Sequence, residues 1–426
     1  MALLRKVPRR LLLRVASVRG YAAALRLLPG ASCLFDEPVH VKVEGLSPGR
    51  NVELRSQLTD DRGVTFRASA TYRADQSGVV DVARSPSLGG TYSGPGSMGL
   101  LWSMEPTVAH TRLTKRDASK PLLVDVEVVG DGRTLARATN ERRFMADGVR
   151  RVAVKAGRIR GTMFVPPGPG PFPAVLDLYT FGGGLVEHRA SLLASKGFVV
   201  LALAMYNYQD LPKVVNKFHL EYFEEAVEFL RTSPEVKGPG IGIISISKSG
   251  DIALSMASFL PGVSATVSIN GCNACTVFPL HYKDKVIPPL KVDLKKVVIR
   301  GDGILDIRDV LHDPTSEDNL ASVIPIERAN GQFLFAASED DRNWNSYLFL
   351  DQAVQRLKDH GKDNFEVVKY AKAGHFLDTP YMPLCLSTMH AAVGKVVAFG
   401  GDPQVHAEAQ VDLWKRVQEF FNKHLA

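Results

Sequence analysis

The sequence predicts an α/β protein in which an all-β sandwich precedes a domain with a mostly parallel, doubly wound sheet. Between residues 36 and 147, apolar and polar residues alternate with period two, which is typical of antiparallel strands with one buried face. From residue 148 to residue 426, short apolar runs alternate with amphipathic helical segments, which indicates parallel strands with right-handed crossovers. A serine at position 247 stands between one of these runs and a helical pattern.

The first 35 residues differ from the rest of the chain in charge. They contain seven Lys and Arg residues and no acid, whereas the whole chain has 52 basic and 45 acidic residues. The rest of the chain therefore has 52 − 7 = 45 basic and 45 acidic residues and no net charge. This balance gives no electrostatic reason to expect nucleic-acid binding. An Arg-rich, acid-free leader predicts a mitochondrial transit peptide over residues 1–35, processed near Tyr21 and Ala22. We expect the mitochondrial matrix, with cytosol or peroxisome as alternatives.

Composition is that of an ordinary globular protein. Of the 426 residues, 45% are hydrophobic and 23% are charged, and no apolar run approaches the roughly 20 residues of a transmembrane segment. Four cysteines do not indicate a disulfide scaffold, so a reducing compartment is the simpler interpretation. Cys272 and Cys275 form a C-x-x-C that follows a strand and has no second pair for zinc, so we expect two incidental thiols and no metal site. No sequence feature defines an oligomeric state.

The β-sandwich prediction depends on four alternating segments. Residues 51–58 and 64–72 flank the turn residues 60–63, and residues 121–129 and 134–139 continue the pattern. Roughly a hundred residues of this kind fit a β-sandwich. This region contains no catalytic constellation of its own.

The second domain begins with alternating strands and helices. A Pro-rich stretch at 166–171 predicts a hairpin loop before the buried strand 174–179, and residues 198–203 form the next strand. An amphipathic helix over 219–230 leads into a strand at 240–246. Together these segments predict a parallel sheet.

A nucleophile elbow is predicted where this last strand ends. Residues 241–250 read I-G-I-I-S-I-S-K-S-G, an apolar strand followed by a sharp turn that holds Ser247 and then by a helix. The usual form is G-x-S-x-G. Here Ser245 and Ser249 occupy the two small-residue positions, which gives them a structural role.

An acid and a histidine follow in the order that the α/β-hydrolase fold uses. Strand 332–337 leads to Asp340 and Asp341, and strand 365–370 leads to His375. Because the carboxyl ends of parallel strands share one edge of the sheet, we expect these side chains to meet Ser247. Asp340 competes with Asp341 for the role of the acid, and we favour Asp341.

The expected chemistry is nucleophilic catalysis. His375 would accept the Ser247 proton as the hydroxyl attacks a carbonyl carbon, and Asp341 would hold the imidazole and stabilise its cation. The backbone N–H groups of Lys248 and Gly183 are candidates for binding the oxyanion. The glycines at 182–184 have an alternative interpretation as a flexible loop between strand and helix.

Extended motifs then indicate a family. These are Y-R-A-D (72–75), S-L-G-G (87–90), M-G-L-L-W (98–102), F-H-L-E-Y-F-E-E-A (218–226), L-S-M-A-S-F-L (254–260), H-Y-K (281–283), D-D-R-N-W (340–344), G-H-F-L-D-T-P-Y-M-P-L-C (374–385) and H-A-E-A-Q-V-D-L-W-K (406–415). Over residues 36–425 the chain resembles the type I acyl-CoA thioesterases, which share a family with bile acid-CoA:amino acid N-acyltransferase.

The resemblance implies the same two domains, with Ser247, Asp341 and His375 as the triad. It implies hydrolysis of fatty acyl-CoA to fatty acid and CoA, and we expect long-chain substrates. CoA is part of the substrate, and no cofactor is needed. The N-acyltransferase has cysteine as its nucleophile, so Ser247 favours hydrolysis. Conjugation of the acyl group to glycine or taurine stays an alternative. A catalytically impaired family member that only binds acyl-CoA is another, because Ser249 in place of glycine crowds the elbow.

Overall fold

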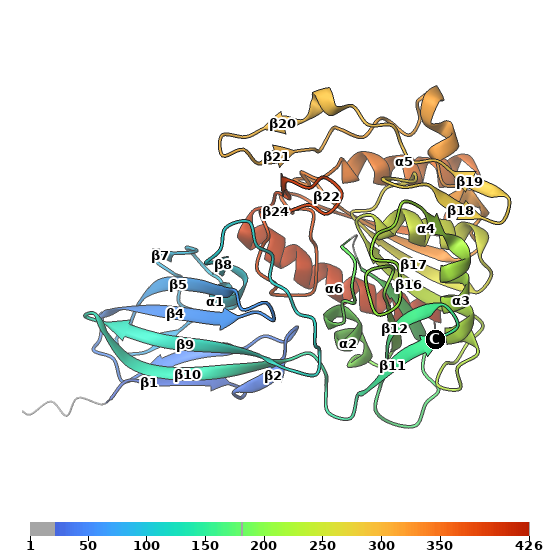
Figure 1. Cartoon of the computed structure of the whole chain (residues 1–426). Coiled ribbons are helices and arrows are strands. Elements are labelled where there is room, and N and C mark those ends of the chain that lie inside the picture. Colours follow the sequence, from blue (N-terminus) through green and yellow to red (C-terminus); the bar gives the residue numbers. More distant parts are fainter. Residues whose placement is uncertain (1–21, 180–181, 426) are drawn as a thin grey trace, which may run out of the picture.

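The computed structural model describes residues 22–179 and 182–425 (Figure 1). The N-terminal part contains two sheets, one with the order β2-β10-β9-β4-β5-β7, in which β8 also pairs with β5, and one with the order β1-β3-β6. The elements of this part are β1 (Ala24–Leu28), β2 (Ser32–Leu34), β3 (His40–Glu44), β4 (Asn51–Thr59), β5 (Thr65–Arg73), β6 (Val80–Asp81), β7 (Gly89–Gly90), α1 (Gly99–Trp102), β8 (Glu105–Pro106), β9 (Leu122–Gly130) and β10 (Arg133–Arg143).

Period-two alternation places one face of these strands in a core. In β4, Val52, Leu54 and Leu58 are buried, while the residues between them are more exposed, apart from Ser56. The strand pairs antiparallel with β5 and with β9, as the alternation predicts.

The expected leader of residues 1–35 overlaps this fold, and its extent needs correction. Residues 24–28 form β1, which pairs along its whole length with β3, and residues 32–34 form β2, which pairs with β10. Phe35 is fully buried in the core. Composition alone did not show where the folded part begins. Residues 1–21, which include the expected processing site at Tyr21, lie outside the described residues.

The second part is built on an eight-stranded sheet with the order β11-β12-β14-β13-β16-β17-β22-β23. Neighbours from β14 to β23 are parallel, and β11 and β12 are antiparallel additions at one edge. The elements are β11 (Arg150–Ala156), β12 (Ile159–Val165), β13 (Ala174–Leu178), α2 (His188–Ala194), β14 (Val199–Leu203), α3 (Leu220–Arg231), β16 (Ile241–Ile246), α4 (Ser249–Phe259), β17 (Val263–Ile269), β22 (Gln332–Ser338), α5 (Ser346–Asp359), β23 (Phe365–Tyr370) and α6 (Pro403–Leu425).

Helices cover both faces of this sheet. Residues of α2 and α6 pack in one apolar cluster, and residues of α3, α4 and α5 pack in another on the opposite face. Strands β13, β14 and β16 are buried throughout, because apolar layers lie on both sides of them. The predicted α/β class, with a β-sandwich before an α/β-hydrolase domain, is confirmed.

Two small sheets and three short 3-10 helices complete the second part. One sheet contains β15 (Phe218–His219), β18 (Leu280–Tyr282) and β19 (Lys285–Ile287), and the other has the order β20 (Val298–Ile299), β21 (Leu305–Asp306), β25 (Val396–Ala398), β24 (Ser387–Met389). The 3-10 helices are η1 (Leu294–Lys296), η2 (Glu317–Ser322) and η3 (Ile326–Arg328). The Pro-rich stretch at 166–171 is not the hairpin loop that we expected, because β14 lies between β12 and β13.

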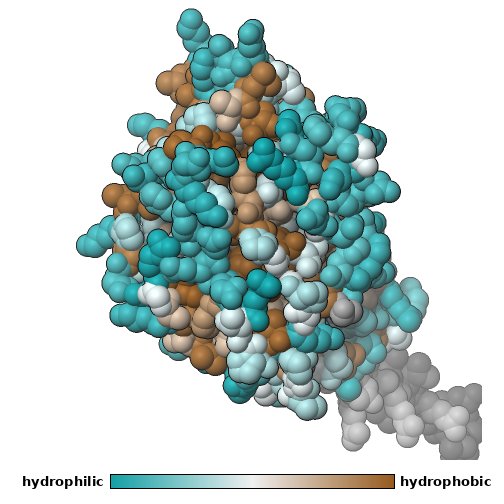
Figure 2. Space-filling model, turned by 90° about the vertical axis from the view of Figure 1, so that its right-hand side faces the viewer, coloured by the Kyte–Doolittle hydropathy of each residue, from teal (hydrophilic) through white to brown (hydrophobic). Residues whose placement is uncertain are grey.

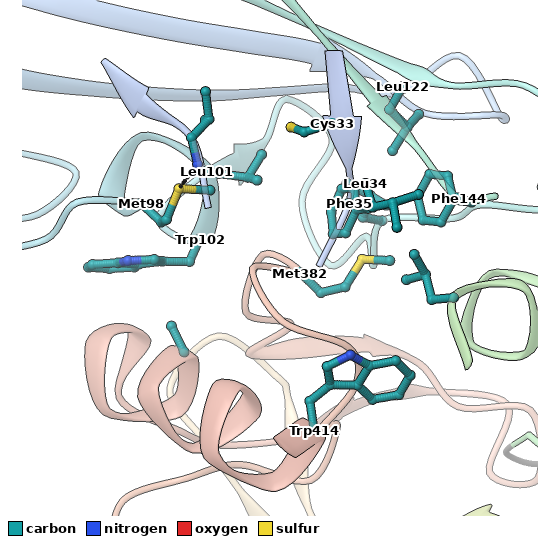
Figure 3. Packing of buried hydrophobic residues seen from close by; sticks show 14 of the residues in the cluster. Cys33, Leu34, Phe35, Met98, Leu101, Trp102, Leu122, Phe144, Met382 and Trp414 are labelled. Atoms are coloured by element: carbon teal, nitrogen blue, oxygen red, sulfur yellow. Dashed lines mark hydrogen bonds between the residues drawn. The ribbon is translucent and has the colours of Figure 1, made fainter. Parts of the chain in front are cut away.

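An apolar interface joins the two parts. Figure 3 shows Trp102, Phe35 and Phe144 of the sandwich on one side and Met382 and Trp414 on the other, all in one buried cluster. At its edge, Nε1 of Trp414 donates a hydrogen bond of 2.8 Å to Asp36. The sandwich is therefore fixed against α6.

Among the described residues, no helix has the length and apolar character that crossing a membrane requires.

Candidate active site

Ser247 occupies the turn between β16 and α4. Its φ angle of 62° is in the left-handed region, which residues other than glycine rarely adopt outside tight turns. The helix that follows lies close to the next strand's end: a Cβ on Gly250 would come within 2.7 Å of the Cα of Gly271. The local sequence therefore forms the strained elbow that its small residues predict.

Both serines that flank the elbow have hydroxyl groups with defined partners. The Ser249 hydroxyl donates to the carbonyl oxygen of Leu178, at 2.7 Å, and accepts from the backbone N–H of Ile246, at 3.0 Å. The Ser245 hydroxyl donates to the carbonyl of Val267, at 2.8 Å. Ser249 thus connects the elbow to the end of β13, and the turn accommodates its side chain.

The structure brings Ser247, His375 and Asp341 together from three strand ends. Nε2 of His375 lies 2.8 Å from Oγ of Ser247, and Nδ1 lies 2.7 Å from Oδ2 of Asp341. Asp341 is fully buried, His375 is 1% exposed and Ser247 is 6% exposed, so little water competes for these hydrogen bonds. With its Nδ1 proton donated to Asp341, the neutral ring can accept the Ser247 proton on Nε2.

Asp341 and its rival Asp340 have separate surroundings. Asp341 accepts hydrogen bonds from the backbone N–H groups of Asn343 and Trp344 and from the Ser346 hydroxyl. Asp340 instead pairs with Arg342 and accepts from the backbone N–H of residue 401. Only Asp341 of the two contacts His375.

Sequence reasoning missed the residues that hold His375 in place. Asn270, at the end of β17, donates 2.7 Å and 3.3 Å hydrogen bonds to the carbonyls of His375 and Gly374. His406 of α6 accepts from the N–H of Gly374 through Nδ1, at 3.0 Å, and donates to the carbonyl of Phe376 through Nε2, at 2.9 Å. The backbone on each side of the imidazole is therefore fixed. The sequence position of Asn270 directly after a strand was the one available signal.

The rings of Trp344 and Phe399 pack against the imidazole of His375. The indole ring of Trp344 meets the His375 ring edge to face at 5.5 Å, and its Nε1 donates to the carbonyl of Asn270 at 2.8 Å. On another side, the ring of Phe399 lies 5.5 Å from that of His375, and its carbonyl accepts from the His375 N–H. Few orientations of the imidazole are compatible with these neighbours.

A buried polar cluster lies beside the histidine loop. His188 and Tyr179 both bond to the carboxylate of Asp378, three residues beyond His375. Burial favours a raised pKa for Asp378, but the charge and hydrogen bond of His188, with help from Arg189, outweigh burial and lower this pKa. Arg112 of the sandwich part reaches the cluster, with its guanidinium 4.3 Å from the ring centre of Phe376.

The two candidate oxyanion donors lie on different loops. Lys248 is the N-cap residue of α4, and none of the described residues accepts a hydrogen bond from its backbone N–H. Gly183 lies in the loop from β13 to α2 with a φ of 68°, where an added Cβ would come within 2.7 Å of the Tyr206 ring. The same loop includes residues 180 and 181, which lie outside the described residues.

Behind the elbow is a buried ion pair. Nζ of Lys248 lies 2.8 Å and 2.9 Å from the two carboxylate oxygens of Asp251, which also accepts from Thr276. Cys272 and Cys275 are free and buried nearby, and burial raises the pKa of the Cys275 thiol to about 12. A thiol that stays protonated is a weak nucleophile.

The fold and the site define a hydrolase of the α/β-hydrolase class. Residues 36–156 match the family described as "Acyl-CoA thioester hydrolase/BAAT N-terminal region", and residues 218–426 match "BAAT / Acyl-CoA thioester hydrolase C terminal". The chain belongs to this acyl-CoA thioester hydrolase family.

Relatives in the family extend over nearly the whole chain. Human acyl-coenzyme A thioesterase 1 is 49% identical over 409 residues, which cover 95% of this chain and 97% of that protein. Human mitochondrial acyl-coenzyme A thioesterase 2 is also 49% identical, over 95% of this chain and 85% of that protein. A crystal structure of acylaminoacyl peptidase from Pyrococcus horikoshii aligns with a TM-score of 0.41 at 15% identity, over 91% of this chain and 59% of the peptidase.

Proposed function

We propose that this protein hydrolyses fatty acyl-CoA to free fatty acid and CoA through an acyl-enzyme on Ser247. The observation that carries the proposal is the buried hydrogen-bonded chain from Ser247 through His375 to Asp341, with distances of 2.8 Å and 2.7 Å. The thioester substrate class is supported by the relatives, whose names are acyl-coenzyme A thioesterases. We also propose two domains, a sandwich domain that ends at residue 147 and includes β1 and β2 before residue 36, and a hydrolase domain over residues 148–426.

Acylation begins with attack by the Ser247 oxygen on the thioester carbonyl carbon. The hydroxyl proton moves to Nε2 of His375, and Asp341 stabilises the imidazolium through Nδ1. When the tetrahedral intermediate collapses, the carbon–sulfur bond breaks, and the CoA sulfur leaves with the proton from Nε2. The acyl group then remains as an ester on Ser247.

The oxyanion that forms during attack needs preorganised donors. We assign this role to the backbone N–H groups of Lys248 and Gly183. The Lys248 N–H is supported as a donor because it follows the nucleophile directly and no described residue uses it. Glycine at position 183 suits a backbone that must approach a substrate closely.

Deacylation repeats these steps with water. His375 accepts a proton from the water as its oxygen attacks the ester carbonyl, and the Ser247 oxygen then recovers a proton from Nε2. The products are a free acid and the original enzyme. This mechanism uses no metal and no redox cofactor, and CoA enters and leaves as part of the substrate.

The test is release of CoA from palmitoyl-CoA by the full-length protein and by Ser247→Ala. We expect Ser247→Ala to lose at least about a thousandfold in kcat. Ser258→Ala is the matched control, because the Ser258 hydroxyl is buried and bonds within α4 to the carbonyl of Leu254. Equal activity of the wild type and Ser247→Ala would refute the proposal.

The same assay separates the alternatives when glycine or taurine is added. Amide product that forms faster than free acid would show an N-acyltransferase. Tight binding of palmitoyl-CoA with no turnover in the wild type would show a binding protein. The hydrolase instead predicts free acid as the main product with or without the amino acid.

We propose the mitochondrial matrix as the location. The acid-free, Arg-rich residues 1–21 support it, and the thioesterase 2 relatives from human, mouse and rat are named mitochondrial. Fusion of a fluorescent protein to the C-terminus of the full-length protein tests the address, and a diffuse cytosolic or a peroxisomal signal would contradict it.

A further inference from the structure

A segment of the sandwich lies against the hydrolase part (Figure 1). We call residues 107–118, between β8 and β9, the strap. Nδ1 of His110 lies 2.8 Å from Oγ of Ser387, and the backbone N–H of Ala118 donates to Glu187 at 3.4 Å. The face of the hydrolase part in Figure 2 points away from the sandwich, and hydrophilic and hydrophobic atoms are interspersed on it. The strap instead makes polar contacts on the side that the sandwich covers.

Two residues of the turn between β4 and β5 hold the strap in place. The Lys115 ammonium donates to Asp61 at 2.9 Å, and the same carboxylate accepts from the N–H of Arg116 at 2.7 Å. Arg62 donates to the backbone carbonyl of Arg112. The backbone of Arg112 is therefore fixed to the sandwich.

The side chain of Arg112 reaches two segments of the hydrolase part. Its guanidinium carbon lies 4.3 Å from the ring centre of Phe376, the residue after His375. Its Nη1 donates to the Tyr179 hydroxyl at 3.3 Å. Tyr179 directly follows β13 and begins the loop that contains Gly183. One side chain of the sandwich thus contacts the segments that hold His375 and Gly183.

Phe376 connects Arg112 to the imidazole. The Phe376 ring meets the His375 ring edge to face at 5.4 Å, and it lies 4.7 Å from the ring of Phe399, which also contacts His375. A cation over an aromatic ring is attracted by the negative charge of the ring face. Arg112 therefore restricts the orientation of Phe376, and Phe376 restricts that of the imidazole.

A second connection runs through Tyr179. Its hydroxyl accepts from Arg112 and donates to the carboxylate of Asp378. The other oxygen of Asp378 lies 2.9 Å from Nε2 of His188. Because Asp378 stands three residues after His375, this chain of hydrogen bonds also connects Arg112 to the histidine loop.

The contacts of Arg112 differ from those of an ordinary interface arginine. Such residues usually form ion pairs. Arg112 forms none with any described residue, and Asp378 uses its two oxygens for Tyr179 and His188. We propose that Arg112 is a positioning residue, through which the sandwich aligns the segments of His375 and Gly183 for catalysis. This inference rests on the proposed function.

Labelling of Ser247 tests the alignment without a thioester. With a fluorophosphonate probe, the Ser247 oxygen bonds to phosphorus, fluoride leaves, and Nε2 of His375 takes the hydroxyl proton. We expect full-length Arg112→Met to be labelled at least about tenfold more slowly than the wild type, because small displacements of reacting groups cost this much. With palmitoyl-CoA, kcat should fall by a similar factor while KM stays within about twofold.

Two further variants separate the role of the cation from a general effect of losing an arginine. Arg112→Lys keeps a cation that can lie over Phe376, so it should recover about two- to fivefold of the lost labelling rate. Arg55→Met is the matched control, because Arg55 is exposed on the sandwich and pairs with Glu53. It should be labelled at the wild-type rate.

A double-mutant cycle shows whether Arg112 acts through Phe376. Phe376→Leu removes the ring that Arg112 contacts, so adding Arg112→Met to this variant should cost at most about threefold. A substitution that only loosened the fold would lower the rate by the same factor with either residue at position 376. Urea denaturation measures the folded fraction of each variant, and the rates are compared per folded molecule.

Three results would overturn the proposal. One is a folded Arg112→Met with the labelling rate and kcat of the wild type. Another is a double variant in which the two single losses multiply. The third is a raised KM with unchanged kcat, which would make Arg112 a substrate-binding residue. If the wild type is labelled at Ser247 but releases no CoA, the proposed function fails, and the labelling rates still test Arg112.

Discussion

The side-chain amide of Asn270 donates a hydrogen bond of 2.7 Å to the carbonyl oxygen of His375. The same side chain accepts from the N–H of Ser338, at the end of β22, and the carbonyl of Asn270 accepts from Trp344. Asn270 is fully buried, so its hydrogen bonds have no replacement from bulk water. One residue therefore connects the strand ends that hold the acid and the histidine.

Replacement of Asn270 by Asp should impair both stability and rate. A carboxylate cannot donate to the carbonyls of His375 and Gly374, so buried acceptors lose their partner and face a negative charge. We expect the free energy of unfolding to fall by about 3 kcal/mol and kcat to fall at least about tenfold with little change in KM. Urea denaturation and CoA release measure these effects.

The control for this variant is Asn345→Asp. Asn345 is the N-cap of α5 and only accepts a hydrogen bond, from the N–H of Leu348, which Asp can do equally well. Its stability and rate should stay near the wild-type values. If Asn270→Asp matched the wild type in kcat, Asn270 would have no positioning role.

Stability should depend on pH through His406. Burial lowers the pKa of this imidazole to about 4, from its ordinary value of 6.5. Between these values the unfolded chain binds a proton that the folded protein does not, so the free energy of unfolding falls as pH falls. His406 alone should contribute a decrease of about 1.5 kcal/mol between pH 6.5 and pH 5.

His406→Gln isolates this contribution. An amide can accept from the N–H of Gly374 and donate to the carbonyl of Phe376, but it does not titrate in this range. The variant should show a shallower dependence of the free energy of unfolding on pH, measured by urea denaturation at several pH values. An unchanged slope would mean that His406 is protonated equally in the folded and unfolded states.

Ser249→Gly tests whether the serine crowds the elbow. Because the Ser249 hydroxyl bonds to Leu178 and Ile246, we expect glycine to lower the free energy of unfolding by about 1–2 kcal/mol without raising kcat. Ser255→Ala, which removes a hydroxyl that bonds within α4, is the control for thermal denaturation and CoA release. A marked rise in kcat for Ser249→Gly would show that the native turn is strained by its side chain.

Much of the fold and of the candidate site could be predicted from the hydrophobic pattern of the sequence. Strand β4 follows from alternating apolar and polar residues, and β16 follows from a continuous apolar run. Ser247, Asp341 and His375 could be predicted because each lies within a few residues of the end of a strand. Asn270 and His406 could not be assigned, because their contacts depend on how separate loops approach one another. The four-stranded sheet with β20 was missed since two- and three-residue strands have no readable period.

The N-terminal boundary was wrong for a different reason. Residues 24–34 share the acid-free composition of the leader, yet they pair with β3 and β10. Strand pairing with distant segments is a tertiary property, and local charge does not report it.

The most direct test of the central claim is identification of the acylated residue. The full-length protein is mixed with palmitoyl-CoA, quenched in acid within one turnover, digested and sequenced by tandem mass spectrometry. We expect one palmitoyl group on Ser247, and none in Ser247→Ala. A palmitoyl group on Cys272, Cys275 or any residue other than Ser247 in the wild type would contradict the proposed mechanism.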